Sequence, residues 1–399
     1  MMDLQWSGPQ AAIRAEYASI ASRIDQDELR LGRRAFDQRT WDQLASAGLW
    51  QMIVPEEYGG RGTGWWDFTA ALEGLASGIR TPGLLLSVIA QAGMVRALDL
   101  FGSPAQKHDY LGRILRGELS ATAIADPDTG TDVRATSSVL SPGPNETFVL
   151  NGAKYNIAHA PVASFTLVVC KLAGHDRDGT SLVLLDAGSE GLHTGPPDRK
   201  LGNLDLPTGP MHFDNVPLHY GNLLGTPGEG LRNLVSFVSL GRLYYGLAAA
   251  WLVEPMLAAA MDYARERQTF GVPVIEHQYV QKKLTDLRIA AETAKWTAYG
   301  ALHQLLSGAP EAAMSCSIAK LAGAEAITEG AVDLLKLYGS RGYHEGEVST
   351  FLRDALAFCS VGGTEEMHRR NIIGQMTRLH ARSKRQPAPG LRKRALETA

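Results

Sequence analysis

The sequence is poor in cysteine. Its 399 residues include only Cys170, Cys316 and Cys359, which are far apart and form no CxxC pair or Cys/His cluster. Disulfide frameworks and structural zinc sites need grouped ligands, so this spacing argues against both. We expect free thiols, the reducing environment of the cytoplasm and no metal site.

Excess charge, export signals and long apolar runs are lacking as well. Thirty-nine basic and forty-two acidic side chains leave a formal net charge of -3, which provides no positive field for nucleic acid. Residues 1–6 lack the basic region and apolar run of an export signal. No apolar stretch approaches the roughly 20 residues of a membrane span. We therefore expect neither nucleic acid nor a membrane as a partner.

The chain has an ordinary globular composition, 45% apolar and 20% charged, arranged as helical, β and helical sequence. Helix formers dominate 11–117, apart from a Pro/Gly-rich interruption at 55–62. Short β-branched or aliphatic runs follow at 148–150, 166–170, 181–185 and 211–213, with Asn151-Gly152 as a hairpin turn. From 284 to 305, leucine and alanine recur at steps of three and four, which places them on one helix face.

These changes in sequence pattern predict an α+β protein in four parts. We expect an N-terminal helical domain at 1–120, a middle β domain at 121–227, a C-terminal helical bundle at 228–381 and a basic flexible tail at 382–399.

Four motifs occur together in the chain. They are PEEYGG at 55–60, DPDTGTD at 126–132, NGAK at 151–154, and RERQTFG at 265–271 with EHQ at 276–278. In this order and spacing they resemble the acyl-CoA dehydrogenase family, from about residue 41 to 376. The resemblance implies a helical domain, a middle barrel-like β domain and a four-helix bundle, assembled as a homodimer or homotetramer. It also implies FAD bound between lobes and between subunits, and an acyl thioester substrate carried by CoA or a carrier protein.

The resemblance also implies positions that contact FAD. Gly130 and Thr131 would meet the pyrophosphate, while Arg267, Thr269 and Phe270 would reach the FAD of a neighbouring subunit. The remaining implied FAD positions are Ala125, Asn156, Ala158, Gln278, Lys336, Gly339 and Thr364.

The chain departs from the family pattern at the catalytic base. Family members carry a glutamate either in a Tyr-Glu-Gly-Thr loop or in the helix that opens the third domain. Here Gly362 and Gly241 occupy those two positions. Because a hydrogen side chain cannot accept a proton, we expect ordinary α,β-desaturation to be absent.

The chain also lacks several side chains that contact the flavin in the family pattern. Ala125 and Ala158 lack the hydroxyls expected there, Asn156 lacks a stacking indole, and Lys336 replaces a glutamine. The positions that would serve a neighbour's FAD (Arg267, Phe270 and Gln278) are largely kept.

Several residues could replace the base or line the acyl pocket. Glu365 and Asp126 are weak candidates for the base, and Asp126 is better explained as structural. Tyr244 and Tyr245, after Arg242, either line the acyl pocket with Gly362 or pack within their helix. His159 and His368 are typical of satisfied surface or interface histidines.

Three functions remain open. The first is an oxidoreductase-like flavoenzyme that acts on an acyl thioester with atypical chemistry. The second is a flavin-poor or non-catalytic subunit that completes the site of a paralogous acyl-CoA dehydrogenase in a hetero-oligomer. The third is a thioester-binding protein without chemistry.

Overall fold

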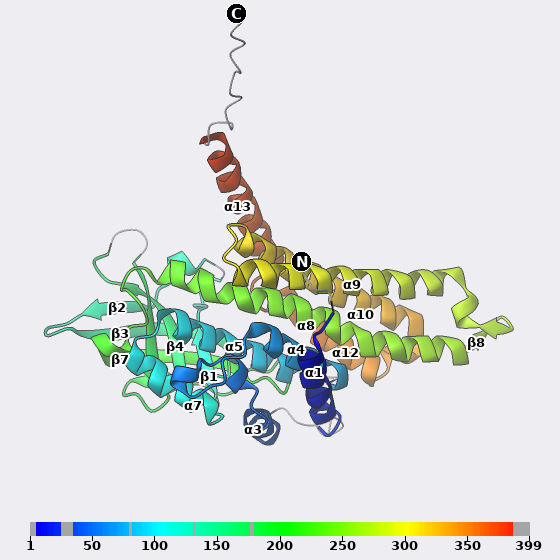
Figure 1. Ribbon diagram of the computed structural model, residues 1–399, viewed down its shortest axis with the longest axis horizontal. Coiled ribbons are helices and arrows are strands. Elements are labelled where there is room, and N and C mark those ends of the chain that lie inside the picture. Colours follow the sequence, from blue (N-terminus) through cyan, green and yellow to red (C-terminus); the bar gives the residue numbers. More distant parts are fainter. Residues whose placement is uncertain (1–4, 25–34, 80–81, 131, 176–178, 386–399) are drawn as a thin grey trace, which may run out of the picture.

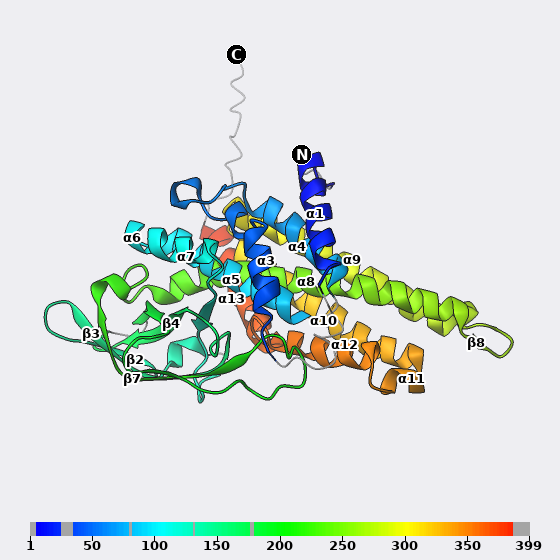
Figure 2. The ribbon, with the colours of Figure 1, turned by 90° about the horizontal axis from the view of Figure 1, so that it is seen from below.

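The computed structural model describes residues 5–24, 35–79, 82–130, 132–175 and 179–385, with the side chains of 382–385 excluded. The molecule is elongated, with a β domain at one end and a small hairpin at the other (Figure 1). Long helices join the two ends, and the last helix projects from the side of the body (Figures 1 and 2).

The N-terminal part is helical, as predicted. Its elements are α1 (Gly8–Ala21), α3 (Gln38–Ser46), η1 (Trp50–Met52), η2 (Glu56–Tyr58), α4 (Trp65–Gly78), α5 (Pro82–Phe101), α6 (Pro104–Gln106), the π-helical η3 (Lys107–Leu111) and α7 (Gly112–Leu115). Trp41, Trp50 and Phe68 are buried together. The ring centroid of Trp50 lies 5.2 Å from that of Trp41 and 6.2 Å from that of Phe68. Burial of these large rings joins α3 and η1 to α4.

The middle part forms a seven-stranded mixed sheet with its own apolar core. The strands are β1 (Ser120–Ala123), β2 (Val139–Pro142), β3 (Thr147–Ala158), β4 (Phe165–Leu172), β5 (Thr180–Asp186), β6 (Leu192–Thr194) and β7 (Thr208–His219). Their order is β1-β4-β2-β3-β7-β6, and β5 pairs with β4. The four strand runs expected from the sequence all lie within these strands.

The predicted hairpin turn at Asn151-Gly152 is wrong, because both residues lie inside β3. The glycine instead permits a close approach between strands: a Cβ at Gly152 would lie 2.6 Å from Ser138 Cα, and its φ is +142°. The pairing of β3 with β7 shifts register between Leu150 and Gly152, as at a β-bulge. The chain reverses between β2 and β3 at Asn145 and Glu146, which have φ values of 54° and 57°.

The C-terminal part is a bundle of long helices. It contains α8 (Gly230–Glu266), α9 (Gln278–Leu306), α10 (Ala312–Tyr338), α11 (Ser340–Tyr343), α12 (Glu347–Ala355), η7 (Leu356–Cys359) and α13 (Glu365–Arg385). Strands β8 (Gln268–Thr269) and β9 (Val272–Pro273) form a hairpin between α8 and α9. Leu284, Leu287, Ala291, Ala294, Ala298 and Ala301 are buried on α9, which confirms the predicted face. Because α13 continues to Arg385, residues 382–385 of the expected flexible tail are helical, and the rest of the tail lies outside the described residues.

Helices α8 and α10 cross with their backbones in contact. A Cβ at Gly246 would overlap the carbonyl of Ala319, and one at Gly323 would overlap the backbone of Gly246. Glycine at both positions therefore allows an approach that any side chain would prevent. Arg242 lies one turn before Gly246 and Lys320 one turn before Gly323, and both side chains act on His368.

Two helices are long and apolar enough to cross a membrane by length and composition alone: α5 and α8. Their most apolar 18-residue windows are 67% and 72% buried inside the structure, as expected for core helices. The sequence-based expectation that no apolar stretch approaches this length is therefore corrected.

Candidate functional site

Gly241 and Gly362 meet at the ring of Tyr245. Gly241 lies in α8, one turn before Tyr245, and a Cβ there would be 3.6 Å from Tyr245 Cε2. Gly362 lies between η7 and α13, and a Cβ there would be 2.5 Å from Tyr245 Cδ2. Gly362 also has φ +72°, a backbone conformation that favours glycine. The fold thus brings both implied base positions together, and a tyrosine ring occupies the space beside them.

Glu365 does not face this space as a free carboxylate. It occupies the first turn of α13 and forms an ion pair with Arg369 at 2.6 Å, four residues along the same helix. Its side chain is 59% exposed. The structure therefore shows this weak base candidate in a solvated helical pair.

Asp126 is enclosed in the β domain. Its carboxylate and the Lys154 ammonium form an ion pair in which both side chains are 0% exposed. The carboxylate also accepts hydrogen bonds from the Thr136 hydroxyl (2.8 Å), the Ser137 hydroxyl and backbone N–H, and the Ser138 N–H. This network joins β3 to the segment before β2 and supports a structural role.

The environment keeps Asp126 ionised. Burial alone would raise the pKa of its carboxyl, but Lys154 and the Ser137 N–H lower that pKa below its usual value. A proton acceptor needs a free lone pair near the reacting carbon and a pKa near the working pH. Asp126 has neither property.

Tyr244 and Tyr245 differ sharply, although they are adjacent. Tyr244 is fully buried, and its hydroxyl lies 2.9 Å from the Thr69 hydroxyl and 3.3 Å from the Trp65 carbonyl oxygen. Tyr244 therefore packs between helices, which is the second of the two roles that the sequence left open. Tyr245 is only partly buried and lies against Gly362, and burial raises its pKa to about 12. Of the pair, Tyr245 is the one beside the candidate site.

Basic side chains lie near this region, and the sequence analysis missed two of them, Arg96 and Lys320. Arg242 lies one residue after Gly241, His368 lies in α13, Lys320 lies in α10 and Arg96 lies in α5. His368 and His159 are both 0% exposed, so the expectation of surface or interface histidines is wrong. One signal was visible in the sequence: Arg96 is the single basic residue of the apolar helix α5.

The β domain carries the positions implied for the flavin ring (Ala125, Asn156 and Ala158) and two implied for the pyrophosphate (Gly130 and Thr131). Asn156 is exposed with φ 53°, inside a second register shift of β3, and Ala158 ends that strand beside Thr208. The carbonyl of Ala125 accepts a hydrogen bond from the Tyr155 N–H at 3.0 Å. Gly130 has φ +55° and open space around its Cβ position, and Thr131 lies outside the described residues. Tyr155, 40% exposed in the same bulge, is an aromatic that the sequence analysis did not single out.

The other implied cofactor residues lie at the far end of the molecule. Arg267 ends α8, Thr269 belongs to β8, Phe270 is at the tip of the β8–β9 hairpin and Gln278 begins α9. Figures 1 and 2 both place this hairpin opposite the β domain. Phe270 is 97% exposed with φ 53°, and the Thr269 hydroxyl lies 2.9 Å from His277 Nε2. These residues are too far from the β domain to complete a site within one chain.

Lys336 and Gly339 belong to the same far end. Tyr338, between them, stacks on Tyr263 of α8 with ring centroids 4.2 Å apart. The Arg267 N–H in turn donates to the Tyr263 carbonyl at 2.9 Å. Lys336 is half exposed and pairs with Asp333 at 3.3 Å. Thr364 lies elsewhere, at the start of α13, where its hydroxyl accepts from the Met367 N–H at 3.5 Å.

These residues fit FAD unevenly. The far end presents an exposed guanidinium, a half-exposed ammonium and an exposed aromatic ring, a donor set suited to pyrophosphate and adenine. The β domain presents backbone groups, Asn156 and Tyr155 in place of two hydroxyls and an indole. Arg267, Lys336 and Phe270 would therefore hold the dinucleotide end, while the ring end would rest on backbone and Tyr155.

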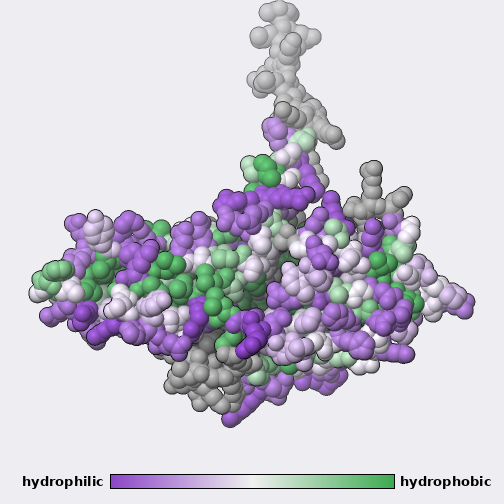
Figure 3. All heavy atoms as spheres, turned by 180° about the vertical axis from the view of Figure 1, so that it is seen from behind, coloured by the Kyte–Doolittle hydropathy of each residue, from purple (hydrophilic) through white to green (hydrophobic). Residues whose placement is uncertain are grey.

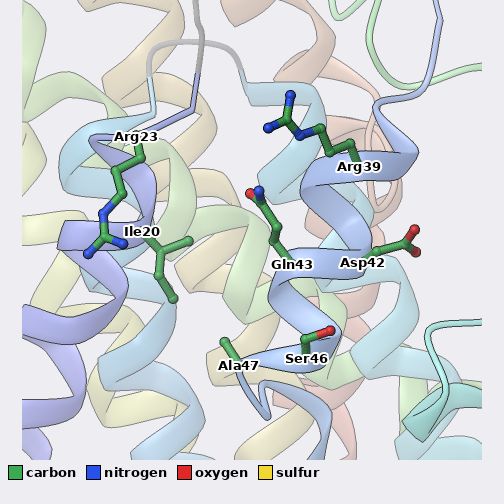
Figure 4. Close-up of a pocket in the computed structure, with 7 residues that line it drawn as sticks. All are labelled: Ile20, Arg23, Arg39, Asp42, Gln43, Ser46 and Ala47. Carbon is green, nitrogen blue, oxygen red and sulfur yellow. The ribbon is translucent and has the colours of Figure 1, made fainter.

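Surface hollows give two further locations. A cavity of about 690 Å³ lies between α1 and α3, lined by Ile20, Arg23, Arg39, Asp42, Gln43, Ser46 and Ala47 (Figure 4). No residue predicted to bind cofactor or substrate lines it. On the face shown in Figure 3, the surface is hollowed below the base of α13, with apolar side chains in and beside the hollow. Gly362 lies three residues before the first residue of that helix, Glu365.

The comparisons with known proteins agree with this architecture. Models of the acyl-CoA dehydrogenase N-terminal, middle and C-terminal domains match residues 9–118, 121–216 and 228–377. The human mitochondrial short-chain specific acyl-CoA dehydrogenase is 30% identical, over 91% of this chain and 87% of that protein. A 3-sulfinopropanoyl-CoA desulfinase of Cupriavidus necator is 27% identical over 94% of both chains. Butyryl-CoA dehydrogenase from Megasphaera elsdenii superposes with a TM-score of 0.86, at 24% identity, over 94% of this chain and all of that one. The chain therefore belongs to the acyl-CoA dehydrogenase family.

Proposed function

We propose that the protein is an FAD-dependent oxidoreductase-like enzyme that acts on an acyl thioester of CoA or a carrier protein without the usual carboxylate base. The observation that carries this proposal is the pair Gly241 and Gly362 around Tyr245. The two acids considered as a replacement base are engaged with other side chains: Glu365 pairs with Arg369, and Asp126 pairs with Lys154.

The residues of the chain limit the reaction. When bound, FAD supplies a two-electron acceptor for a hydride. Beside the two glycines, Tyr245 has a pKa of about 12, which holds its hydroxyl protonated at neutral pH. Such a group donates a hydrogen bond but removes no proton from carbon. The site therefore suits a thioester that loses a group other than a proton, or one whose α-position is already acidic.

The relatives include an enzyme of compatible name. The Cupriavidus necator protein is called a desulfinase, while the human protein is called a dehydrogenase. Proteins of this fold thus have names that describe more than one reaction. The glycines at both base positions favour a reaction other than ordinary dehydrogenation for this chain. The buried free thiols Cys170 and Cys316 and the exposed Cys359 support a reducing, cytoplasmic location as part of the proposal.

A second function is favoured by the β8–β9 hairpin. Arg267 and Phe270 are exposed, far from their own β domain, and are suited to a neighbour's cofactor. A flavin-poor subunit that completes a paralogue's site would keep this hairpin while losing its own ring contacts. The first function instead needs a homo-oligomer. In it, each chain binds FAD in its own β domain and contributes its hairpin to the FAD of a neighbouring chain.

The absorbance spectrum before and after incubation with FAD separates the two. The first function predicts a yellow protein that holds about one FAD per chain after removal of free cofactor. Protein that stays colourless after incubation would contradict it and favour the partner subunit. The same spectrum of a mixture with a paralogous dehydrogenase then tests the second function.

A further inference from the structure

Three basic side chains converge where α5, α8 and α10 pack together beneath the candidate site. The guanidinium groups of Arg96 and Arg242 both act on the thiol of Cys316: burial raises its pKa to about 12, and both arginines oppose that rise. Lys320 lies one turn after Cys316 on the same face of α10. The cationic cluster, defined here as Arg96, Arg242 and Lys320, therefore faces one region of the interior.

The two arginines are poorly satisfied. Nε of each is buried and has no hydrogen-bond partner. Nη2 of Arg242 contacts Met367 Sδ at 3.7 Å, a weak acceptor, and the Arg96 guanidinium lies 5.9 Å from the centre of the Trp65 ring. Among the described residues, neither arginine has a carboxylate within ion-pair distance.

Lys320 and His368 are buried beside the arginines. Lys320 is 1% exposed, and its ammonium donates to the Phe358 carbonyl at 2.9 Å. His368 is 0% exposed, and its ring lies against the backbone of Gly362 and Gly363, which acts to raise its pKa. Burial, with Arg242 and Lys320 nearby, lowers the pKa of His368 to about 3, so the ring is neutral at pH 7 and has one N–H to donate.

Asp99 acts on Arg96, and Glu365 and Glu366 act on Lys320, but no ion pair joins these carboxylates to the cluster among the described residues. Asp99, the closest acid in sequence to Arg96, lies 3.9 Å from Lys107, and Glu365 pairs with Arg369. Burying a cation without an opposite charge is costly, so proteins normally pair such groups. Arg96 and Arg242 each keep a buried Nε without a hydrogen-bond partner and form no ion pair among the described residues, which indicates that their missing partner is an anionic ligand.

We propose that the cationic cluster binds a carboxylate at the acyl end of the substrate, which makes the substrate a thioester of a dicarboxylic acid. The proposal rests on the acyl thioester function given above. Arg242 follows Gly241 directly, and His368 lies beside Gly363, so the cluster adjoins the implied reaction centre. The planar fork of an arginine matches a carboxylate. The pyrophosphate of FAD is a poor candidate, because the suited residues lie at the hairpin end.

Calorimetric binding to the full-length protein, incubated with FAD, tests the proposal. The probes are glutaryl-CoA, valeryl-CoA (the same chain length with a neutral end) and free glutarate. We expect glutaryl-CoA to bind about tenfold or more tightly than valeryl-CoA, as for a charge-assisted hydrogen bond in a buried site. Arg96→Met should abolish that preference, and Arg96→Lys should keep part of it. Arg116→Gln, which removes a 65% exposed charge elsewhere, should leave it unchanged.

The outcomes separate the two proposals. Equal binding of both thioesters, or tighter binding of valeryl-CoA, would overturn the dicarboxylate assignment and leave the acyl thioester function standing. Glutarate that binds as tightly as glutaryl-CoA would show that the anion is not the end of an acyl chain. If neither thioester binds, both proposals fail. The comparison of probes on the unchanged protein decides the matter even if Arg96→Met does not fold.

Discussion

Tyr245 connects the two glycines at the scale of single residues. A side chain at Gly362 would begin 2.5 Å from the ring and would require a strained backbone, whereas one at Gly241 would begin 3.6 Å away on an ordinary helix. The packing of Tyr245 and the backbone conformation therefore exclude a glutamate at position 362. Neither of them excludes a glutamate at position 241.

This difference makes Gly241→Glu the better test of the missing base. If FAD and thioester bind as proposed, the new carboxylate should raise the rate at which butyryl-CoA bleaches the flavin by about a hundredfold or more, the usual range for a general base. Stopped-flow absorbance without oxygen measures that rate. Gly241→Gln is the matched control and should stay at the wild-type rate. No gain with glutamate would mean that the missing carboxylate is not the obstacle.

His159 gives a prediction about pH. Burial lowers its pKa to about 4, and Nδ1 lies 3.0 Å from the Ser120 carbonyl. The unfolded chain therefore binds a proton below about pH 6.5 that the folded chain refuses, so stability falls as the pH falls. Between pH 6.5 and 4 we expect a loss of about 3 kcal/mol from this residue. Urea unfolding should show a flatter pH profile for His159→Asn, whose side chain tolerates the positive φ of 67°. An unchanged profile would contradict this assignment.

At the scale of elements, the crossing of α8 and α10 positions the cationic cluster. Gly246 and Gly323 let the backbones touch, with Arg242 and Lys320 one turn away on the two helices. A wider crossing would separate these cations and remove the shared region that they face.

Gly246→Ala should therefore be strongly destabilising. Its methyl group would overlap the Ala319 backbone, which no side-chain movement relieves, and we expect a loss of about 3 kcal/mol or more in the free energy of unfolding. Gly93→Ala is the matched control, since nothing lies within 4 Å of its Cβ position in α5. It should be neutral or stabilise by up to about 1 kcal/mol. Similar urea midpoints for the two variants would contradict the close crossing.

Sequence periodicity predicted the elements better than it predicted their contacts. The α9 face was evident because buried leucines and alanines repeat with the helical period. The hairpin turn predicted at Asn151-Gly152 was wrong, because the same dipeptide occurs in tight turns and where two strands approach closely. Only the position of Ser138 beside Gly152 in the structure distinguishes the two cases. The cationic cluster could not be predicted, because its members come from α5, α8 and α10, and its unpaired state depends on three-dimensional neighbours. The meeting of Gly241 and Gly362 was available only through the family resemblance.

At the scale of the whole molecule, one chain carries the two groups of residues proposed to bind FAD at its opposite ends. The β domain carries Ala125, Gly130, Asn156 and Ala158, and the hairpin end carries Arg267, Phe270 and Lys336. If both groups bind one FAD as proposed, a second chain must complete the site. The exposed ring of Phe270 supports that arrangement.

Arg267→Ala should weaken FAD binding without affecting the fold. Loss of one charge-assisted contact to a phosphate raises the Kd by about tenfold or more, while an exposed arginine contributes within about 0.5 kcal/mol to stability. Arg265→Ala, an exposed arginine in the last turn of α8, is the matched control and should retain the cofactor. Fluorescence titration with FAD and urea unfolding measure both effects. Equal FAD affinity in both variants would contradict a role for the hairpin.

The central claim is that two glycines remove the ordinary reaction from a scaffold that otherwise supports it. Its most direct test is the absorbance of the FAD-loaded protein mixed with butyryl-CoA in the absence of oxygen. The account predicts that the oxidised flavin band persists. Rapid loss of that band in the unchanged protein would show that another residue removes the α-proton and would contradict the account.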